Sequence, residues 1–252
     1  MLRFLPSSVA PRLSRALFPI ALAASLLAAA PHAAAQSRNL APGFSALPVD
    51  AKVIVAPIDV ELFLVTGGGV AEPKADWTES ATKHMKTAFG AKAQTMKLGM
   101  ADMDGKIADD NADLLHLHAA VARSISQHHY GFVKLPTKDD KLDWSFGDSL
   151  RPLQQSTGAR YALFTWVRDS YASAERKAMM AVVGVLSLLA TGGTNMVVLG
   201  GGVQTGYATL VDMETGQVLW FNQLVSSTGD LREIEPAKAT VDALLKDFPA
   251  AK

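Results

Sequence analysis

The sequence predicts an α+β fold with an α/β-like pattern: one small mixed sheet with helices packed on it, a C-terminal β-hairpin and a final helix. Strand-like and helix-like segments alternate along residues 51–250, as they do in layered sheet-and-helix domains. The clearest strand pair, at 206–225, surrounds a tight turn and is therefore antiparallel, so the sheet is expected to be mixed. We expect a single domain at 51–250, preceded by an aperiodic linker at 36–50.

The first half of this domain is expected to hold a strand at 51–65 broken near Pro57, a helix at 76–90, a strand at 91–98 and a helix at 108–131. β-Branched residues dominate the first segment, and proline interrupts a strand because it has no amide hydrogen. Asp76 or Thr78 suits the start of the first helix, and Gly90 suits its end. Apolar residues three and four apart give the second helix one buried face.

The second half is expected to hold a short helix at 149–157, a strand at 160–173, the hairpin at 206–225 and a helix at 235–248. Gly216 supplies the positive φ that a hairpin turn with a bulge needs. Pro236 suits the first turn of the last helix, where a missing amide hydrogen is tolerated. The buried stripe of that helix is expected to consist of Val241, Leu244, Leu245 and Phe248.

The first 35 residues have the pattern of a secretory signal peptide. A positively charged start precedes an apolar run at 16–30. This run is shorter than the roughly 20 residues that a membrane-spanning helix needs. Ala33 and Ala35 satisfy the small-x-small pattern of a cleavage site. We therefore expect residues 1–35 to be removed on export, with a mature chain that begins at Gln36.

Composition excludes several classes of protein. The absence of cysteine excludes a disulfide framework, a thiolate zinc site and a lipid-modified amino-terminal cysteine. The chain has 24 basic and 24 acidic residues, and without the three arginines of the signal peptide 21 basic residues remain. This balance does not favour nucleic-acid binding. A periplasmic location, or association with the outer membrane, is expected.

Residues 147–150 read Gly-Asp-Ser-Leu, which matches the nucleophile block of a family of lipases and esterases. Such an enzyme places its serine after a buried strand and needs a downstream base to accept the serine proton. The preceding residues 138–146 are too charged for a buried strand, and all six histidines precede Ser149. We expect Asp148 or Ser149 to cap the short helix that ends at Gly158, and we keep an ester hydrolase using Ser149 as an alternative.

Neither a metal ion nor a cofactor is expected. His116 and His118 are two residues apart on a helix and diverge, whereas ligands on one helix are three or four residues apart. His118 and His129 share a face but lie about 16 Å apart along it. The glycines at 67–69 follow a strand, but Glu72 stands where a phosphate-binding loop has its third glycine. Three aspartates at predicted strand ends are expected in turns or caps: Asp169, Asp212 and Asp230.

The most unusual stretch lies between Lys177 and Asp212, where the chain carries no charge. Its centre, 178–204, is an apolar glycine-rich insert whose first 13 residues are too few to span a bilayer. One interpretation is a core helix followed by a loop and a strand. The other is a segment that docks on lipid or on neighbouring subunits. The candidate contact residues are Met179, Met180, Val183, Gly184, Leu186, Gly192, Gly193, Gly200, Gly201 and Gly202.

Two stretches around this insert resemble a known group of proteins. Residues 147–158 lead into a strand through a Thr-Gly-Ala turn, and the following hairpin carries Asp212, Thr215 and Gly216 at its tip. This layout resembles envelope proteins that include the curli secretion channel subunit, the lipoprotein activators of penicillin-binding proteins and the amino-terminal domain of the Tol–Pal periplasmic protein. The resemblance implies a small mixed sheet and a non-enzymatic role in envelope assembly. The channel subunit has a membrane-inserting segment in a place comparable to 178–204. The lipoproteins carry a lipid-bearing cysteine, which this chain lacks.

We expect a non-catalytic, exported cell-envelope protein. It would act as an adaptor or assembly factor through contacts with envelope proteins, with other copies of itself or with a membrane surface, and not with nucleic acid. A small-ligand binding protein is a further alternative, which requires a pocket.

Overall fold

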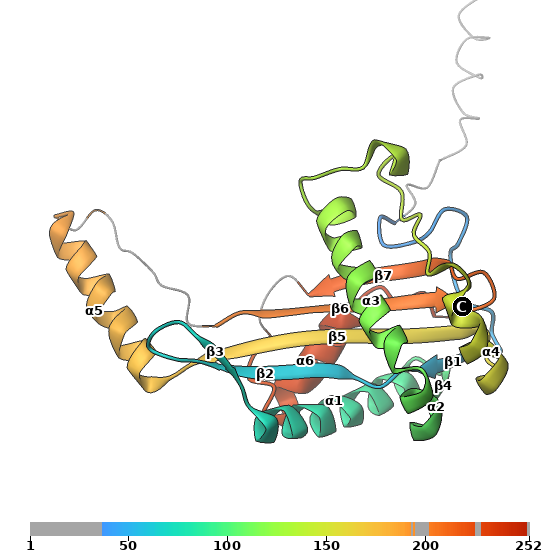
Figure 1. The fold of residues 1–252 in the computed structure, drawn as a ribbon, viewed down its shortest axis with the longest axis horizontal. Coiled ribbons are helices and arrows are strands. Elements are labelled where there is room, and N and C mark those ends of the chain that lie inside the picture. Colours follow the sequence, from blue (N-terminus) through green and yellow to red (C-terminus); the bar gives the residue numbers. More distant parts are fainter. Residues whose placement is uncertain (1–36, 193, 195–201, 225–227, 251–252) are drawn as a thin grey trace, which may run out of the picture. The chain divides into compact units, whose positions relative to one another are not determined.

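The computed structural model describes residues 37–192, 194, 202–224 and 228–250 (Figure 1). The predicted signal peptide at 1–35 lies outside these residues. The strands are β1 (Lys52–Val55), β2 (Asp59–Val65), β3 (Ala71–Pro73), β4 (Gly99–Asp102), β5 (Tyr161–Ala172), β6 (Gln204–Asp212) and β7 (Val218–Leu224). The α-helices are α1 (Ala75–Thr95), α2 (Gly105–Asp110), α3 (Ala112–Ile125), α4 (Arg151–Thr157), α5 (Ala174–Ala190) and α6 (Ile234–Leu244).

The long strand β5 organises a seven-stranded sheet, because two shorter strands share one of its edges. β1 runs parallel to residues 161–163 of β5, and β2 runs parallel to residues 166–172. On the other edge β6 is antiparallel to β5, and β7 is antiparallel to β6. β4 extends the sheet beside β1, and β3 extends it beside β2. The predicted mixed sheet and its C-terminal hairpin are confirmed.

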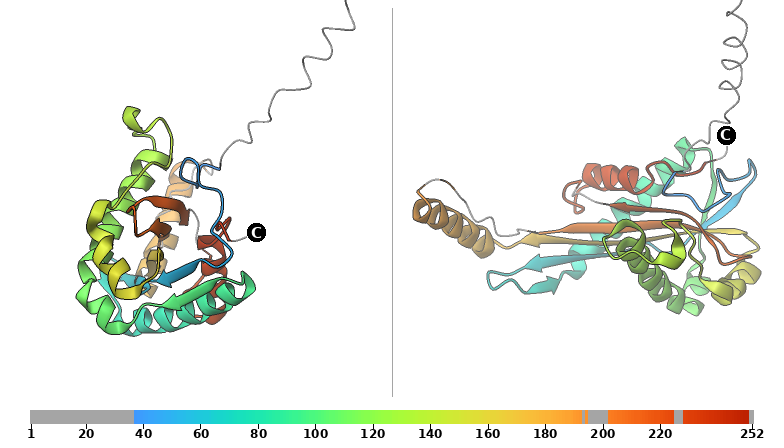
Figure 2. Two further views of the ribbon diagram at one scale, coloured as in Figure 1. Left: turned by 90° about the vertical axis from the view of Figure 1, so that its right-hand side faces the viewer. Right: turned by 90° about the horizontal axis from the view of Figure 1, so that it is seen from above.

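Helices cover both faces of this sheet (Figure 2). On one face α1 and α6 enclose a core cluster that contains Phe89, Leu163 and Trp220. On the other face α3 and α4 enclose a second cluster that contains Phe164 and Phe221. Successive strand residues point to opposite faces, so neighbouring residues of β5, such as Leu163 and Phe164, supply the two clusters in turn.

Residues 37–50, predicted as part of a linker, instead pack on the domain. Leu40 forms a β-bridge with Trp220, and the Ala41 amide donates to the Leu219 carbonyl at 2.9 Å. Ala41 and Leu47 are buried. The linker prediction is corrected because this stretch covers the outer edge of β7, where an exposed edge would offer unpaired backbone groups.

Helix α1 does not end at Gly90, and the predicted strand at 91–98 is wrong. The helix continues to Thr95 because the residues after Gly90 are good helix formers, which together offset a glycine cost of about 1 kcal/mol. The strand of this region, β4, begins only at Gly99.

The predicted helix at 108–131 is divided at Asn111. Asp104 caps the short helix α2 by accepting from the Lys106 amide at 2.9 Å, and α3 starts after the division. A π-helical turn, Ser126–Tyr130, follows α3. The amphipathic periodicity that predicts α3 is confirmed, with Leu114 among its buried residues.

The hairpin turn is confirmed in detail. Gly216 has a φ of +72°, and a Cβ built on it would overlap the backbone of Gly147. Gly216 therefore adopts a left-handed conformation at a point where two chain segments approach closely, and both conditions require glycine. The Phe146 amide donates to the Gly216 carbonyl at 2.8 Å and joins the turn to the segment before α4.

Candidate functional site

The candidate contact segment begins as a free-standing helix. β5 continues into α5 with only Ser173 between them. Ser173 fixes this junction, because its hydroxyl accepts from the Arg176 amide at 3.1 Å and its own amide donates to the Val65 carbonyl at 2.9 Å. Figure 1 shows α5 at the outer end of β5 and β6, beyond the helices that cover the sheet. No described residue of α5 belongs to either core cluster.

The exposed surface of α5 is apolar. Val185 is 57% exposed, Leu186 59% and Leu189 72%. Met179 and Leu188 are also exposed, and because they are nine residues apart they point to opposite sides of the helix. The interpretation of this helix as buried core is therefore wrong for the described residues. An apolar run does not by itself distinguish a core helix from one that is covered only on docking.

The structure sorts the ten candidate contact residues into three groups. Met179, Leu186, Gly192 and Gly202 are exposed. Met180 and Val183 are half-buried, and Gly184 is buried, so these three lie on the inner side of α5. Gly193, Gly200 and Gly201 lie outside the described residues.

A polar cluster of Asp169, Tyr171, Gln204 and Thr228 lies below α5. The buried Asp169 carboxylate accepts from the Ser170 amide at 2.8 Å, the Tyr171 hydroxyl at 2.6 Å and the Gln204 side-chain amide at 2.7 Å. The Gln204 side-chain oxygen accepts from the Thr228 amide at 2.8 Å. Burial raises the pKa of Asp169, and these donors oppose that shift by stabilising the carboxylate. The cluster joins β5, β6 and the segment before α6.

An aromatic and basic layer adjoins this polar cluster. The Arg232 guanidinium lies 4.3 Å from the ring centre of Trp77 and 4.5 Å from that of Tyr171. Arg232 also pairs with Asp230 at 2.5 Å. A cavity of about 620 Å³ opens here, and Lys177 from the first turn of α5 also lines it. Aromatic side chains and charged side chains of both signs, Asp169 and Asp230 among them, therefore lie at the base of the apolar helix.

The geometry around Ser149 differs from the predicted cap. Residues Gly147–Leu150 form a 3₁₀ turn whose cap position is Phe146, and neither Asp148 nor Ser149 caps a helix with its side chain. Asp148 instead pairs with Arg151 at 3.0 Å. In the described part of the chain, no histidine lies within hydrogen-bond distance of the Ser149 hydroxyl. The cap prediction is wrong because α4 continues directly from the 3₁₀ turn, which leaves no extended residue to act as a cap.

The histidines have structural partners. His118 is buried beside the rings of Phe146 and Phe164, and its Nε2 lies 2.9 Å from the Thr209 hydroxyl. Burial lowers the pKa of His118 to about 3, so its ring is neutral at pH 7. His129 Nε2 lies 2.9 Å from the Arg38 carbonyl. Among the described residues, no group of three potential ligands is placed to hold a metal ion.

The three aspartates at strand ends lie in different settings. Asp212 pairs with Arg160 at 2.8 Å and accepts from the Glu214 amide at 2.9 Å, as expected of a turn residue. Asp230 pairs with Arg232 and accepts from its amide at 3.0 Å. Asp169 is the exception, since it is buried in the polar cluster rather than in a turn. Its sequence position alone does not indicate these partners, because one of them, Gln204, comes from β6.

Within the described part of the chain, none of the helices combines the length and hydropathy needed to cross a bilayer. The glycines at 67–69 form the turn between β2 and β3. A Cβ built on Gly67 would contact Glu175 and Met179 of α5, so this turn lies beside the base of the helix.

No family model matches the chain, and no curated protein is significantly similar to it. Solved structures with a similar arrangement include a PelC dodecamer from Paraburkholderia phytofirmans, at 14% identity and a TM-score of 0.37, over 83% of this chain and 94% of that one. The LpoB C-terminal domain from Salmonella enterica has 11% identity and a TM-score of 0.28, over 73% of this chain and 85% of that one. Lipoprotein GNA1162 from Neisseria meningitidis has 14% identity and a TM-score of 0.29, over 80% of this chain and 99% of that one.

Proposed function

We propose that the chain is a non-catalytic cell-envelope protein, an adaptor or assembly factor that holds a membrane surface through α5. The observation that carries this proposal is an exposed apolar helix that belongs to neither core cluster. A helix that is apolar on all sides is normally buried in protein or in lipid. Each large apolar side chain fully removed from water contributes about 1.5–3 kcal/mol, so docking of α5 is strongly favoured.

Lipid suits this surface better than the groove of a partner protein. A groove binds one stripe of a helix, with anchors three and four residues apart. The exposed side chains of α5 instead extend from Met179 on one side to Leu188 on the opposite side. Lipid chains contact all of these side chains at once.

The length and charge of α5 agree with insertion into one leaflet. Its uncharged part, 178–190, is about 20 Å long at 1.5 Å per residue. This is less than the hydrocarbon core of about 30 Å, so the helix enters the bilayer without crossing it. Lys177 and Arg232 then lie at the level of the phosphate groups, and Trp77 lies at the interface that aromatic residues prefer.

Two charges on the outer side of α5 are expected to abolish membrane binding. A carboxylate costs about 2.5–3.5 kcal/mol in the hydrocarbon region, so the double variant Leu186→Glu/Leu189→Glu should bind vesicles at least about a hundredfold more weakly. Binding is measured by co-sedimentation with vesicles of phosphatidylethanolamine and phosphatidylglycerol. Both leucines are exposed, so the denaturation midpoint should not change.

Phe132→Glu is the matched control. Phe132 is also a fully exposed large apolar residue, but it lies outside α5, so its charge variant should sediment with vesicles as the unaltered chain does. The proposal is wrong if the double variant also sediments unchanged. In cells, retention of the unaltered protein on membranes through an alkaline carbonate wash would support insertion. Release of a chain that binds no vesicles would point instead to an envelope protein or to another copy of this chain as the partner.

We also propose that Ser149 has no catalytic role. The supporting observation is that no described histidine bonds to the Ser149 hydroxyl, and that several have other partners, such as Thr209 for His118. The purified chain is expected not to hydrolyse p-nitrophenyl acetate or butyrate above the rate of Ser149→Ala. Turnover that disappears in Ser149→Ala would reinstate the hydrolase.

A further inference from the structure

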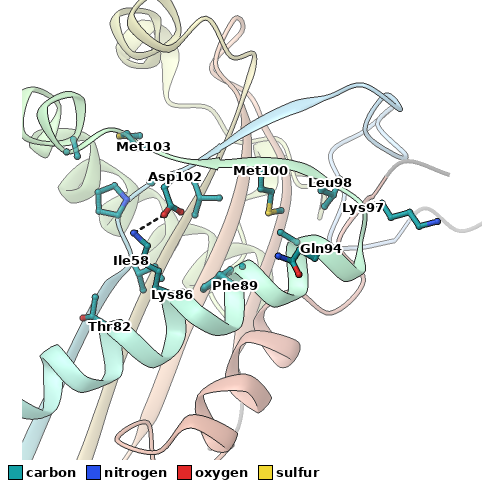
Figure 3. A pocket seen from close by; sticks show the side chains of 17 residues that line it. Ile58, Thr82, Lys86, Phe89, Gln94, Lys97, Leu98, Met100, Asp102 and Met103 are labelled. Carbon is teal, nitrogen blue, oxygen red and sulfur yellow. Dashed lines mark ion pairs between the residues drawn. The ribbon is translucent and has the colours of Figure 1, made fainter.

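A second cavity, far from α5 in the sequence, lies where two adjacent parallel strands end. Its volume is about 530 Å³, within the range of small-molecule sites. β1 ends at Val55 and β4 ends at Asp102, and both residues line the cavity together with α1 (Figure 3). The carboxyl ends of parallel strands are the usual position of ligands in sheets of this kind.

The wall of this cavity is mainly apolar. It is formed by Ile58 after β1, Phe89 on α1, and Leu98, Met100 and Met103 around β4. Figure 3 shows these side chains around one hollow, between α1 and the β4 segment. Methionine adapts its shape to what it contacts, which suits a site for a flexible apolar body.

Small residues on α1 leave the cavity open. The side of α1 that lines it runs from Thr82 to Gln94, with Gly90 and Ala93 between them, and Lys97 follows just after the helix. Glycine inside a helix costs about 1 kcal/mol relative to alanine. A Cβ built on Gly90 meets no atom within 4 Å, so packing does not explain the absence of a side chain there.

The rim carries more positive than negative charge. Three charged residues line the cavity: Lys86, Lys97 and Asp102. Lys86 and Asp102 form an ion pair at 2.8 Å, drawn as a dashed line in Figure 3, and both side chains are largely exposed. Such a pair contributes at most about 1 kcal/mol and opens readily. Lys97 forms no ion pair within the described part of the chain, and is available to an anionic ligand.

We propose that this cavity binds a small amphiphile with an aliphatic body and one anionic group, of the class of medium-chain carboxylates. The aliphatic body lies between Phe89 and Met100, and the anionic group pairs with Lys97, or with Lys86 after its pair with Asp102 opens. This site is independent of the membrane contact proposed for α5. It gives the chain a ligand-binding function in addition to docking.

The test compares decanoate, decanol and decylammonium at concentrations below their aggregation. Binding is measured by titration calorimetry with Leu186→Glu/Leu189→Glu, in which two charges reduce the competing apolar surface of α5. Decanoate is expected to bind about fivefold more tightly than decanol, because one exposed charge contact contributes about 1 kcal/mol, and decylammonium should bind most weakly. Lys97→Gln should reduce the affinity for decanoate and leave that for decanol unchanged.

Blocking variants locate the site. Ala93→Phe should reduce the affinity for all three probes more than tenfold, and Ala91→Phe, on the same helix but outside the lining, should not. If Ala93→Phe unfolds, Gly90→Leu serves instead, because its side chain has open space. Absence of saturable binding by any probe, or binding that survives the blocking variant, overturns the proposal. Neither result depends on whether α5 binds vesicles.

Discussion

Replacing Asp169 by alanine is expected to lower the free energy of unfolding by about 3 kcal/mol. Alanine leaves the Tyr171 hydroxyl and the Gln204 side-chain amide without their acceptor, and each unsatisfied buried donor costs about 1–3 kcal/mol. Burial raises the pKa of Asp169, so removing a desolvated carboxylate offsets part of this loss. Urea unfolding followed by tryptophan fluorescence measures the difference.

The controls for this variant separate local from general effects. Asp169→Asn keeps the shape and one acceptor oxygen, and should lose less than half as much stability as the alanine variant. Asp148→Ala removes an exposed carboxylate and should change the free energy of unfolding by no more than about 0.5 kcal/mol. An alanine variant at Asp169 with an unchanged midpoint would show that the polar cluster does not stabilise the junction between β5, β6 and the segment before α6.

Acidification from pH 7 to pH 5 is expected to lower the free energy of unfolding by about 2 kcal/mol through His118 alone. Burial lowers the pKa of His118 to about 3, whereas in the unfolded chain the ring titrates near pH 6.5. Above pH 6.5 the His118 ring is neutral in both the folded and the unfolded chain, so it does not lower the free energy of unfolding. Between pH 6.5 and about 3 the unfolded chain binds a proton that the folded chain does not, so stability falls by about 1.4 kcal/mol per pH unit.

His118→Gln should remove this pH dependence, because glutamine keeps a polar group near Thr209 but does not titrate in this range. His116→Gln is the matched control: His116 lies two residues earlier on α3 and is exposed, so its variant should keep the dependence. Burial also lowers the pKa of His129, which adds a dependence of the same sign in both variants. If the free energy of unfolding changes with pH equally in His118→Gln and in the unaltered chain, the pH dependence does not come from His118.

The sequence predicts best those elements whose pattern is both regular and local. The alternation of side chains along β5 is typical of a strand that contacts a core cluster on each face, so β5 is predicted from sequence. The hairpin is predicted because Gly216 marks its turn. Helix α6 is predicted because its apolar stripe faces a single surface, but it ends at Leu244, so Leu245 and Phe248 of the predicted stripe are buried beyond the end of the helix. In these segments local conformational preference and tertiary packing favour the same structure, so the sequence pattern is sufficient to predict the element.

Errors arise where distant residues decide the local structure. Residues 37–50 lack periodicity and resemble a linker, yet β7 pairs with them through Leu40 and Ala41. Gly90 resembles the end of a helix, yet the residues that follow continue α1. Neither outcome is determined within a short window of sequence.

The two candidate sites also differ in how much of each can be predicted from the sequence. The contact segment is recognisable because the run between Lys177 and Asp212 carries no charge, but its exposure depends on tertiary structure, since no described residue of α5 joins either core cluster. The amphiphile cavity draws residues from β1, α1, β4 and α2, which are separated in the sequence by up to about fifty positions. Only the three-dimensional pairing of β1 with β4 brings Val55 near Asp102.

Because β1 and β2 share one edge of β5, the distance between α5 and the two core clusters depends on the length of the part of β5 that pairs with β2. Residues 161–163 of β5 belong with β1, whereas residues 166–172 belong with β2 and carry α5. Adding two residues to each of β2, β5 and β6 would extend the reach by about 7 Å and keep every side chain on its face. Adding a single residue to a strand would instead turn its later side chains to the opposite face of the sheet. The distance of α5 from the two core clusters can therefore be changed by insertion in steps of two residues.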